Sequence, residues 1–182
     1  MRLLRPLGVL LLLALLAACG NSRTPIPSLT QPAAPNGFRA LLFPRAGIRL
    51  KVPRNWAAIR ERAPLLAIVS SGAAIVAVWR YRRTGSRQPD LGRVRRGLIR
   101  AARARDNTLR VISSTVTTVS GSPAIVLDAI ESIAGHPRRV RSLHVFSPAA
   151  ELVIDEYAPP PVFGAVDRQV FSPLARSLQL SA

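Results

Sequence analysis

The chain has 182 residues, of which 48% are hydrophobic and 19% are charged, a composition that can bury a core and excludes general disorder. Lysine and arginine number 26 against 9 acidic residues, so the formal net charge is +17, and Lys51 is the only lysine. Such a positive charge implies an anionic partner or surface but does not specify a fold. The single cysteine, Cys19, excludes an intrachain disulfide and a Cys-x-x-Cys metal or redox site.

The amino terminus has the pattern of an export signal. Two arginines, Arg2 and Arg5, precede an uninterrupted run of 12 apolar residues at positions 7–18. As a helix this run would be about 18 Å long, well short of the roughly 30 Å of hydrocarbon that a transmembrane helix must cross. Residues 1–18 therefore indicate a signal peptide rather than a membrane span.

Residues 16–20 read Leu-Ala-Ala-Cys-Gly, and this segment resembles a bacterial lipobox. The resemblance implies that signal peptidase II recognises Leu16, Ala17 and Ala18 and that the Cys19 thiol is the site of lipid attachment. The alternative is an ordinary secretory signal that is followed by a cysteine by coincidence. Because two or more acyl chains give stable anchoring, we expect a mature protein that begins at Cys19 and is held on the outer face of the cell membrane.

Residues 19–37 are expected to form the lipidated cysteine and a proline-rich tether. Four prolines stand among Asn, Ser, Thr and Gln with no apolar period, which is typical of an extended segment. At ~3.1 Å per residue, such a tether would reach up to ~50 Å from the bilayer. Residues 38–182 are expected to form one domain, and no internal repeat is visible in the sequence.

The first half of the domain has the patterns of short strands. Apolar runs at 38–43 and 47–52 predict a strand pair, which ends at Pro53, ahead of Trp56. Runs at 65–70 and 73–82 are separated by Ser-Gly and predict a tight hairpin. Within the second of these runs, odd and even positions are expected on opposite faces of the strand.

Residues 90–106 change to a helical period, with Asp90 as a start signal. The apolar side of this helix is expected to cover a sheet, because its hydrophobic residues cluster on one side. The opposite side carries Arg93, Arg96, Arg100 and Arg103.

The second half of the domain is expected to contain four more strands and a terminal helix. Segments 109–119, 124–133, 139–146 and 151–157 are separated by turn residues and predict three consecutive antiparallel connections. Residues 163–178 have one apolar helical face. Pro173 predicts a break or kink in that helix, with Ser172 as the N-cap of a second short segment.

Four segments carry a resemblance to a known fold. They read Gly-Ile-Arg-Leu-Lys-Val-Pro-Arg-Asn-Trp at 47–56, Val-Trp-Arg-Tyr at 78–81, Gly-Ser-Pro-Ala at 121–124 and Phe-Ser-Pro-Leu at 171–174. With the order of the expected elements, they are similar to the PsbP-like fold of the Mog-type Ran-binding proteins and of many short bacterial lipoproteins. The resemblance extends over residues 38–180. It implies an α+β fold, a mostly antiparallel sheet flanked by helices in a PsbP-like α/β/α sandwich, and a binding module without a common catalytic residue set.

The sequence contains no motif of a serine hydrolase, zinc protease, P-loop or dinucleotide-binding enzyme. His136 lies in a Gly-His-Pro turn and is expected to be solvated, and His144 is expected to be a hydrogen-bonded structural residue. Asp128 and Glu131 should point to opposite faces of their strand, as should the adjacent acids at 155–156. We therefore expect no catalytic residues, no metal site and no cofactor.

Two groups of residues remain open to two interpretations each. The arginine side of the helix is either a solvated surface or a surface that binds anionic lipid headgroups or acidic cell-wall polymer. Trp79, Tyr81 and Tyr157 lie near strand ends, where they either pack in a core or line a small apolar pocket. Nucleic acid is not an expected partner, because export removes the chain from it and aromatic residues are only 5% of the chain.

These observations lead to two functional hypotheses. The first is an exported, membrane-anchored lipoprotein whose domain is a noncatalytic interaction module for envelope proteins or anionic envelope polymers. The second is a carrier that holds a lipid or other small apolar ligand between sheet and helix.

Overall fold

The structure is a computed structural model that describes residues 30–84 and 87–181. The expected signal peptide, the lipobox and Cys19 lie outside these residues. None of the helices within the two described ranges is both long enough and apolar enough to cross a bilayer.

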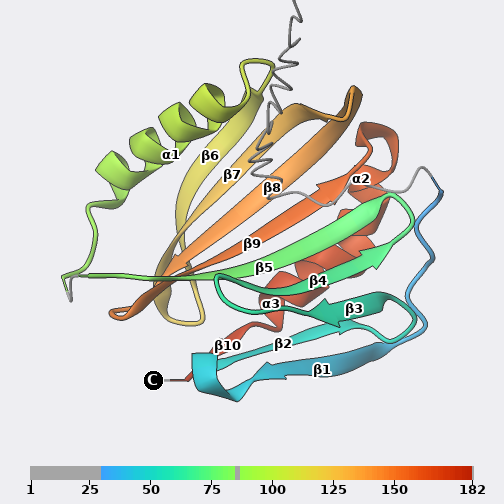
Figure 1. Ribbon diagram of the computed structural model, residues 1–182, viewed down its shortest axis with the longest axis horizontal. Helices are drawn as coiled ribbons and strands as arrows, with labels where there is room; N and C mark the ends of the chain where they lie inside the picture. The colour runs from blue at the N-terminus through green and yellow to red at the C-terminus, as the bar shows by residue number, and fades with distance from the viewer. Residues whose placement is uncertain (1–29, 85–86, 182) are drawn as a thin grey trace, which may run out of the picture.

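The described chain folds into two antiparallel sheets (Figure 1). The smaller sheet has the order β1 (Phe38–Phe43), β2 (Ile48–Pro53) and β10 (Gln179–Leu180). The larger sheet has the order β3 (Ala57–Arg60), β4 (Leu65–Ser71), β5 (Ala74–Arg82), β9 (Ala150–Ala158), β8 (His136–Phe146), β7 (Ser122–Ile133) and β6 (Arg110–Val119).

Tight turns between consecutive strands confirm the predicted hairpins. A 3-10 turn, η1 (Pro44–Ala46), joins β1 to β2, and Gly47 follows it with a left-handed backbone, φ 65°. Gly72 turns β4 into β5 with φ 52°, where an added Cβ would lie 2.4 Å from the Thr30 carbonyl oxygen. After β5 the chain crosses to the far edge of the sheet, where β6 lies. Three hairpins then bring it back through β7 and β8 to β9, which pairs with β5.

Helices lie on both sides of the larger sheet (Figure 1). On one side lies α1 (Leu91–Arg105), which begins at Asp90, whose carboxylate accepts a hydrogen bond of 3.0 Å from the Arg93 N–H. On the other side lies a continuous helical segment made of α2 (Pro160–Val166), η2 (Asp167–Phe171) and α3 (Ser172–Arg176).

The terminal helix is irregular where Pro173 predicted a break. Its middle part, η2, is a π-helical turn, which widens the helix ahead of Pro173. Pro173 has no N–H to donate, and its ring crowds the preceding turn. The expected N-cap is wrong, because Ser172 has helical dihedral angles and its hydroxyl donates instead to Asp167 Oδ1 at 2.7 Å.

The main core lies between the two sheets and the terminal helix. The apolar face of residues 163–178 is buried there, with Phe163, Phe171 and Leu174 at 1% exposure or less. The β5 side chains of Ala74, Val76 and Val78 enter this core, whereas Ile75, Ala77 and Trp79 belong to clusters on the opposite face. The predicted alternation along this strand is therefore confirmed.

Residues 30–37 lie against the domain, although they were expected to belong to the tether. The Trp56 indole N–H donates to the Ala33 carbonyl at 3.0 Å, and the Ala73 N–H donates to the Thr30 carbonyl at 2.8 Å. We call residues 30–37 the N-terminal strap.

Candidate functional site in a pocket between α1 and the sheet

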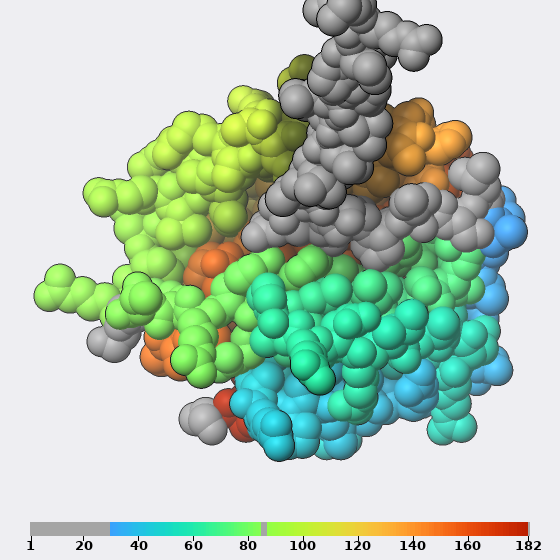
Figure 2. Space-filling view, viewed as in Figure 1, coloured from blue at the N-terminus to red at the C-terminus, as the bar shows by residue number. Residues whose placement is uncertain are grey.

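The face of the larger sheet that is turned towards α1, here called the outer face, is only partly covered. Ala102 is the single buried residue of α1, and it packs with Leu109, Leu127 and Ala129 over β6 and β7. The helix therefore covers less of the sheet than its apolar stripe predicted. Figure 2 shows α1 in yellow-green standing apart from β5 in green, with orange sheet surface recessed between them.

This arrangement leaves a pocket of about 560 Å³ between α1 and strands β5, β7, β8 and β9. Its apolar walls come from both layers, with Leu98 on the helix and Leu127, Val140 and Val153 on the strands. Between these walls lie polar side chains that project from the outer face. A pocket of this size and mixed lining is typical of a site for a small molecule.

The polar groups of the pocket are arranged in pairs. The Ser142 hydroxyl on β8 donates to Asp155 Oδ1 on β9, directly opposite in register. His144 Nδ1 lies 2.7 Å from Glu151 Oε1, which confirms that His144 is hydrogen-bonded. Both pairs line the pocket.

The third pair joins the helix to the sheet. Arg105 Nη2, near the end of α1, donates to Glu131 Oε2 on β7 at 3.2 Å. Glu131 is only 5% exposed, and this burial raises its pKa, an effect that the Arg105 guanidinium reduces and the nearby Asp155 carboxylate increases.

Ser142 and His144 do not form a nucleophile–base pair. A serine nucleophile is activated by a hydrogen bond to a base, but Ser142 and His144 are hydrogen-bonded to separate carboxylates. Within residues 30–84 and 87–181, no group of three or more His, Cys, Asp or Glu side chains is arranged to hold a metal ion.

The structure places the aromatic candidates in and beside this pocket. Tyr81 and Tyr157 line it, whereas Trp79 is buried next to it and stacks on Tyr81 with ring centroids 6.3 Å apart. Sequence analysis did not bring Ser142, Glu151 and Asp155 to the same site. The alternation of each strand placed them on one face, but only the β8–β9 register brings them together.

The arginine candidates of α1 lie on its exposed side, away from the pocket. Among the described residues, only Asp90 comes within ion-pair distance of any of the four, at 3.9 Å from Arg93. Arg96, Arg100 and Arg103 form no ion pair within the described chain.

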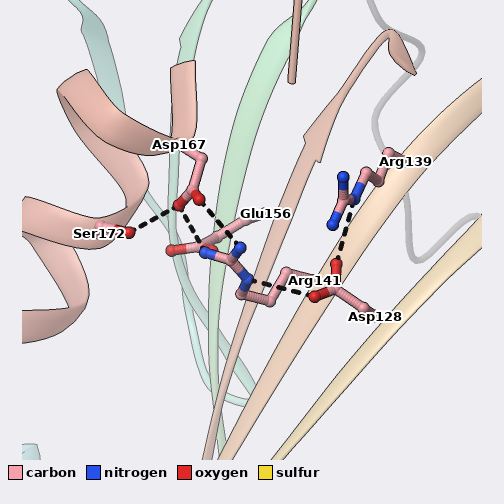
Figure 3. Close-up of polar contacts among 6 residues, drawn as sticks. All are labelled: Asp128, Arg139, Arg141, Glu156, Asp167 and Ser172. Atoms are coloured by element: carbon pink, nitrogen blue, oxygen red, sulfur yellow. Dashed lines mark hydrogen bonds and ion pairs between the residues drawn. The ribbon is translucent and has the colours of Figure 1, made fainter. Parts of the chain in front are cut away.

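A second group of charges occupies the opposite face of the same strands (Figure 3). Arg141 on β8 binds both carboxylate oxygens of Asp167 at 2.5 and 3.0 Å and lies 3.7 Å from Asp128. Arg139 lies 3.3 Å from Asp128. These contacts join β7 and β8 to the π turn of the terminal helix, so the group holds the helix on the sheet. Asp128 and Glu131 thus point to opposite faces, as predicted.

Glu156 also belongs to this group, on the face opposite to Asp155, as predicted. It is 1% exposed, and neither carboxylate oxygen is hydrogen-bonded to a described residue. Its closest cation is Arg141, at 3.8 Å. Burial raises the pKa of Glu156 to about 8, because Arg141 is shared with Asp128 and Asp167 and compensates only part of the lost hydration.

The chain matches no family model and no curated protein. Its fold is nevertheless the PsbP-like, or Mog-type, α+β fold, as solved structures show. The chain is similar to cyanobacterial PsbP (CyanoP) from Synechocystis, with a TM-score of 0.65 and 10% identity over 79% of this chain and 92% of that one.

Two further structures share the fold. One is LpqN, described as involved in cell envelope biogenesis of Mycobacterium tuberculosis, with a TM-score of 0.60 and 16% identity over 80% of this chain and 91% of that one. The other is the Saccharomyces cerevisiae Ran-binding protein Mog1p, with a TM-score of 0.56 and 9% identity over 79% and 95% of the two chains. At these identities the likeness is one of fold, and it confirms the predicted class.

Proposed function

We propose that this protein is an exported lipoprotein, anchored at the outer face of the cell membrane through Cys19, whose PsbP-like domain is a noncatalytic binding module of the cell envelope. The lipobox-like segment at 16–20 supports the anchor. Two proteins of the same fold support the module, since one is described as Ran-binding and the other as involved in cell envelope biogenesis.

The exposed arginine side of α1 carries this proposal. Three of its four guanidinium groups have no ion-pair partner within the described chain, so they remain available to an anionic surface. Residues 19–29 separate the proposed anchor from the strap and would reach at most ~34 Å when extended. This tether lets the domain lie on the surface, where each arginine within about a Debye length, ~8 Å, of a charged bilayer or polymer contributes ~1 kcal/mol of attraction.

The anchor is tested by Cys19→Ser in the full chain. We expect the wild-type protein to incorporate labelled palmitate and to sediment with membranes, and the variant to do neither. A conservative change outside the lipobox, Ser22→Ala, is the matched control and should leave both properties unchanged. Membrane sedimentation of the Cys19→Ser chain that resists high salt would refute the anchor.

The pocket favours a second function, a carrier of a small ligand at the same location. Native mass spectrometry of the protein purified from its own host distinguishes the two. A stoichiometric small molecule would support the carrier, whereas an empty domain that crosslinks to one envelope protein would support the interaction module.

A further inference from the structure

The acidic residues of this chain are not spread over its surface. Only 9 residues of the whole sequence are acidic, against 26 basic ones. Three of the nine, Glu131, Glu151 and Asp155, line the pocket, where Arg105 is the only lysine or arginine among the described lining residues. In a strongly basic protein the pocket is therefore a local site of negative charge, which attracts cations and repels anions.

Three polar groups of the pocket lie close together on two neighbouring strands. His144 on β8 is paired with Val153 on β9, so Glu151 and Asp155 are its two diagonal neighbours on the same face. Each diagonal pair lies about 7–8 Å apart. Glu151 and Asp155, four residues apart on one strand, are separated by about 13 Å, so one small head group can contact His144 together with only one of the two carboxylates.

The hydrogen bonding of His144 indicates the polarity of that head group. Because a carboxylate only accepts hydrogen bonds, the contact with Glu151 Oε1 requires His144 Nδ1 to donate. In the neutral ring, Nε2 is then an acceptor. His144 is largely buried and lines the pocket, so its ring adds an acceptor to a site that already holds carboxylates.

We propose that the pocket between α1 and the outer face binds a small amphipathic molecule with a protonated amine head and an apolar tail. The ammonium group donates to Asp155 and to His144 Nε2, on the edge of the ring turned away from Glu151, and its charge matches both carboxylates. The tail packs against Leu98, Leu127 and Val140. This inference rests on the carrier function proposed above and names its class of ligand.

Three probes with one tail and different heads test this inference: 4-phenylbutylamine, 4-phenylbutanol and 4-phenylbutyrate. Each is titrated calorimetrically into the full lipidated protein in phosphatidylcholine nanodiscs, and empty nanodiscs provide the reference. We expect the amine to bind about tenfold or more tightly than the alcohol, the difference that one charge-assisted contact supplies, and the carboxylate to bind most weakly. Equal affinities, or strongest binding of the carboxylate, would overturn the proposal.

Two variants locate the binding. Glu151→Gln with Asp155→Asn should reduce amine binding about tenfold, to the level of the alcohol, and leave alcohol binding unchanged. The matched control is Glu61→Gln with Asp90→Asn, which changes the net charge equally outside the pocket and should leave amine binding unchanged. Equal losses in both pairs would mean that only net charge matters and would contradict the proposed site.

A third variant does not depend on the carboxylates. Ala101 is exposed on α1 and lines the pocket, so Ala101→Phe should fill part of the volume without disturbing the core, and should weaken the amine and the alcohol together. Unchanged binding of the amine would place it elsewhere and refute the inference.

If a co-purifying ligand without an amine is found, the carrier function stands and this inference fails. If all three probes fail and the protein purifies empty, the carrier function fails with it.

Discussion

At the scale of single residues, Glu156 is the most unusual group in the molecule. It is buried under the terminal helix beside an arginine that binds another carboxylate more closely. Arg141 therefore serves three carboxylates at once, and burial remains the dominant influence on Glu156. The residue is held as the neutral acid at neutral pH, which lets an acidic side chain pack in the apolar core.

The pKa of Glu156 predicts how stability changes with pH. A carboxyl group whose pKa rises from 4.5 to about 8 on folding favours the folded state below pH 4.5, and this contribution is lost as the pH rises to about 8. We expect Glu156→Gln, which keeps the shape and stays neutral, to lose less stability than the wild type between pH 5 and 8.5.

Thermal unfolding followed by circular dichroism measures this difference. At pH 8.5 the variant should melt several degrees above the wild type, since about 1 kcal/mol corresponds to roughly 3 °C in a domain of this size. The exposed substitution Glu61→Gln is the control and should change in parallel with the wild type. Parallel curves for Glu156→Gln would show that the carboxyl group is already ionised at pH 7.

At the scale of elements, α1 has two sides with different roles. Its apolar side touches β6 and β7 at one end and leaves the pocket open, while its arginine side has almost no acidic neighbours among the described residues. Changing one side should leave the function of the other unaffected.

Replacement of Arg93, Arg96, Arg100 and Arg103 by glutamine tests the arginine side. We expect binding to vesicles with phosphatidylglycerol to fall by up to about a thousandfold at low salt, because up to four contributions of ~1 kcal/mol are lost, and the difference to shrink at high salt. Co-sedimentation of the nonlipidated Cys19→Ser chain measures this. The matched control replaces four exposed arginines elsewhere, Arg39, Arg45, Arg49 and Arg62. Equal weakening by both sets would assign the binding to net charge rather than to α1.

At the scale of the whole molecule, the strap makes the domain begin earlier than residue 38. Its carbonyls accept hydrogen bonds from the Trp56 indole and from Asn55 Nδ2, at 3.0 and 2.8 Å, and its Ala33 N–H donates to Ser71 Oγ at 2.9 Å. The strap thus joins the Pro-x-x-Trp turn after β2 to the β4–β5 hairpin. It also sets the length of chain between the proposed anchor and the domain.

Deletion of residues 30–36 should therefore destabilise the domain. We expect a loss of about 2 kcal/mol, from several broken hydrogen bonds and the exposure of Trp56, and a melting temperature lower by several degrees. Deletion of seven residues at 21–27 is the matched control and should leave the melting temperature unchanged. If both deletions had the same effect, the strap would contribute nothing to stability.

Local chemistry accounts for the elements that sequence analysis predicted correctly. Gly72 and Pro44 mark turns that depend only on adjacent residues, Asp90 caps the helix that follows it, and the alternation in β5 requires no partner. Strand β3 was missed because Ala-Ala-Ile-Arg has no clear alternation, and β10 because two residues give no period. These two strands form through pairing with β4 and β2, which lie elsewhere in the chain.

The sequence by itself determined the order of most elements and the face on which each strand residue lies, because these follow from turns and periodicity over a few residues, and its resemblance to the PsbP-like fold indicated the class of fold. Only the tertiary structure decided that α1 stands off the sheet and that the register of β8 and β9 places Asp155 opposite Ser142 and Glu151 beside His144. It also decided that Glu156 lies beneath the terminal helix. Such groupings depend on contacts between segments far apart in the chain, and no local pattern of residues records them.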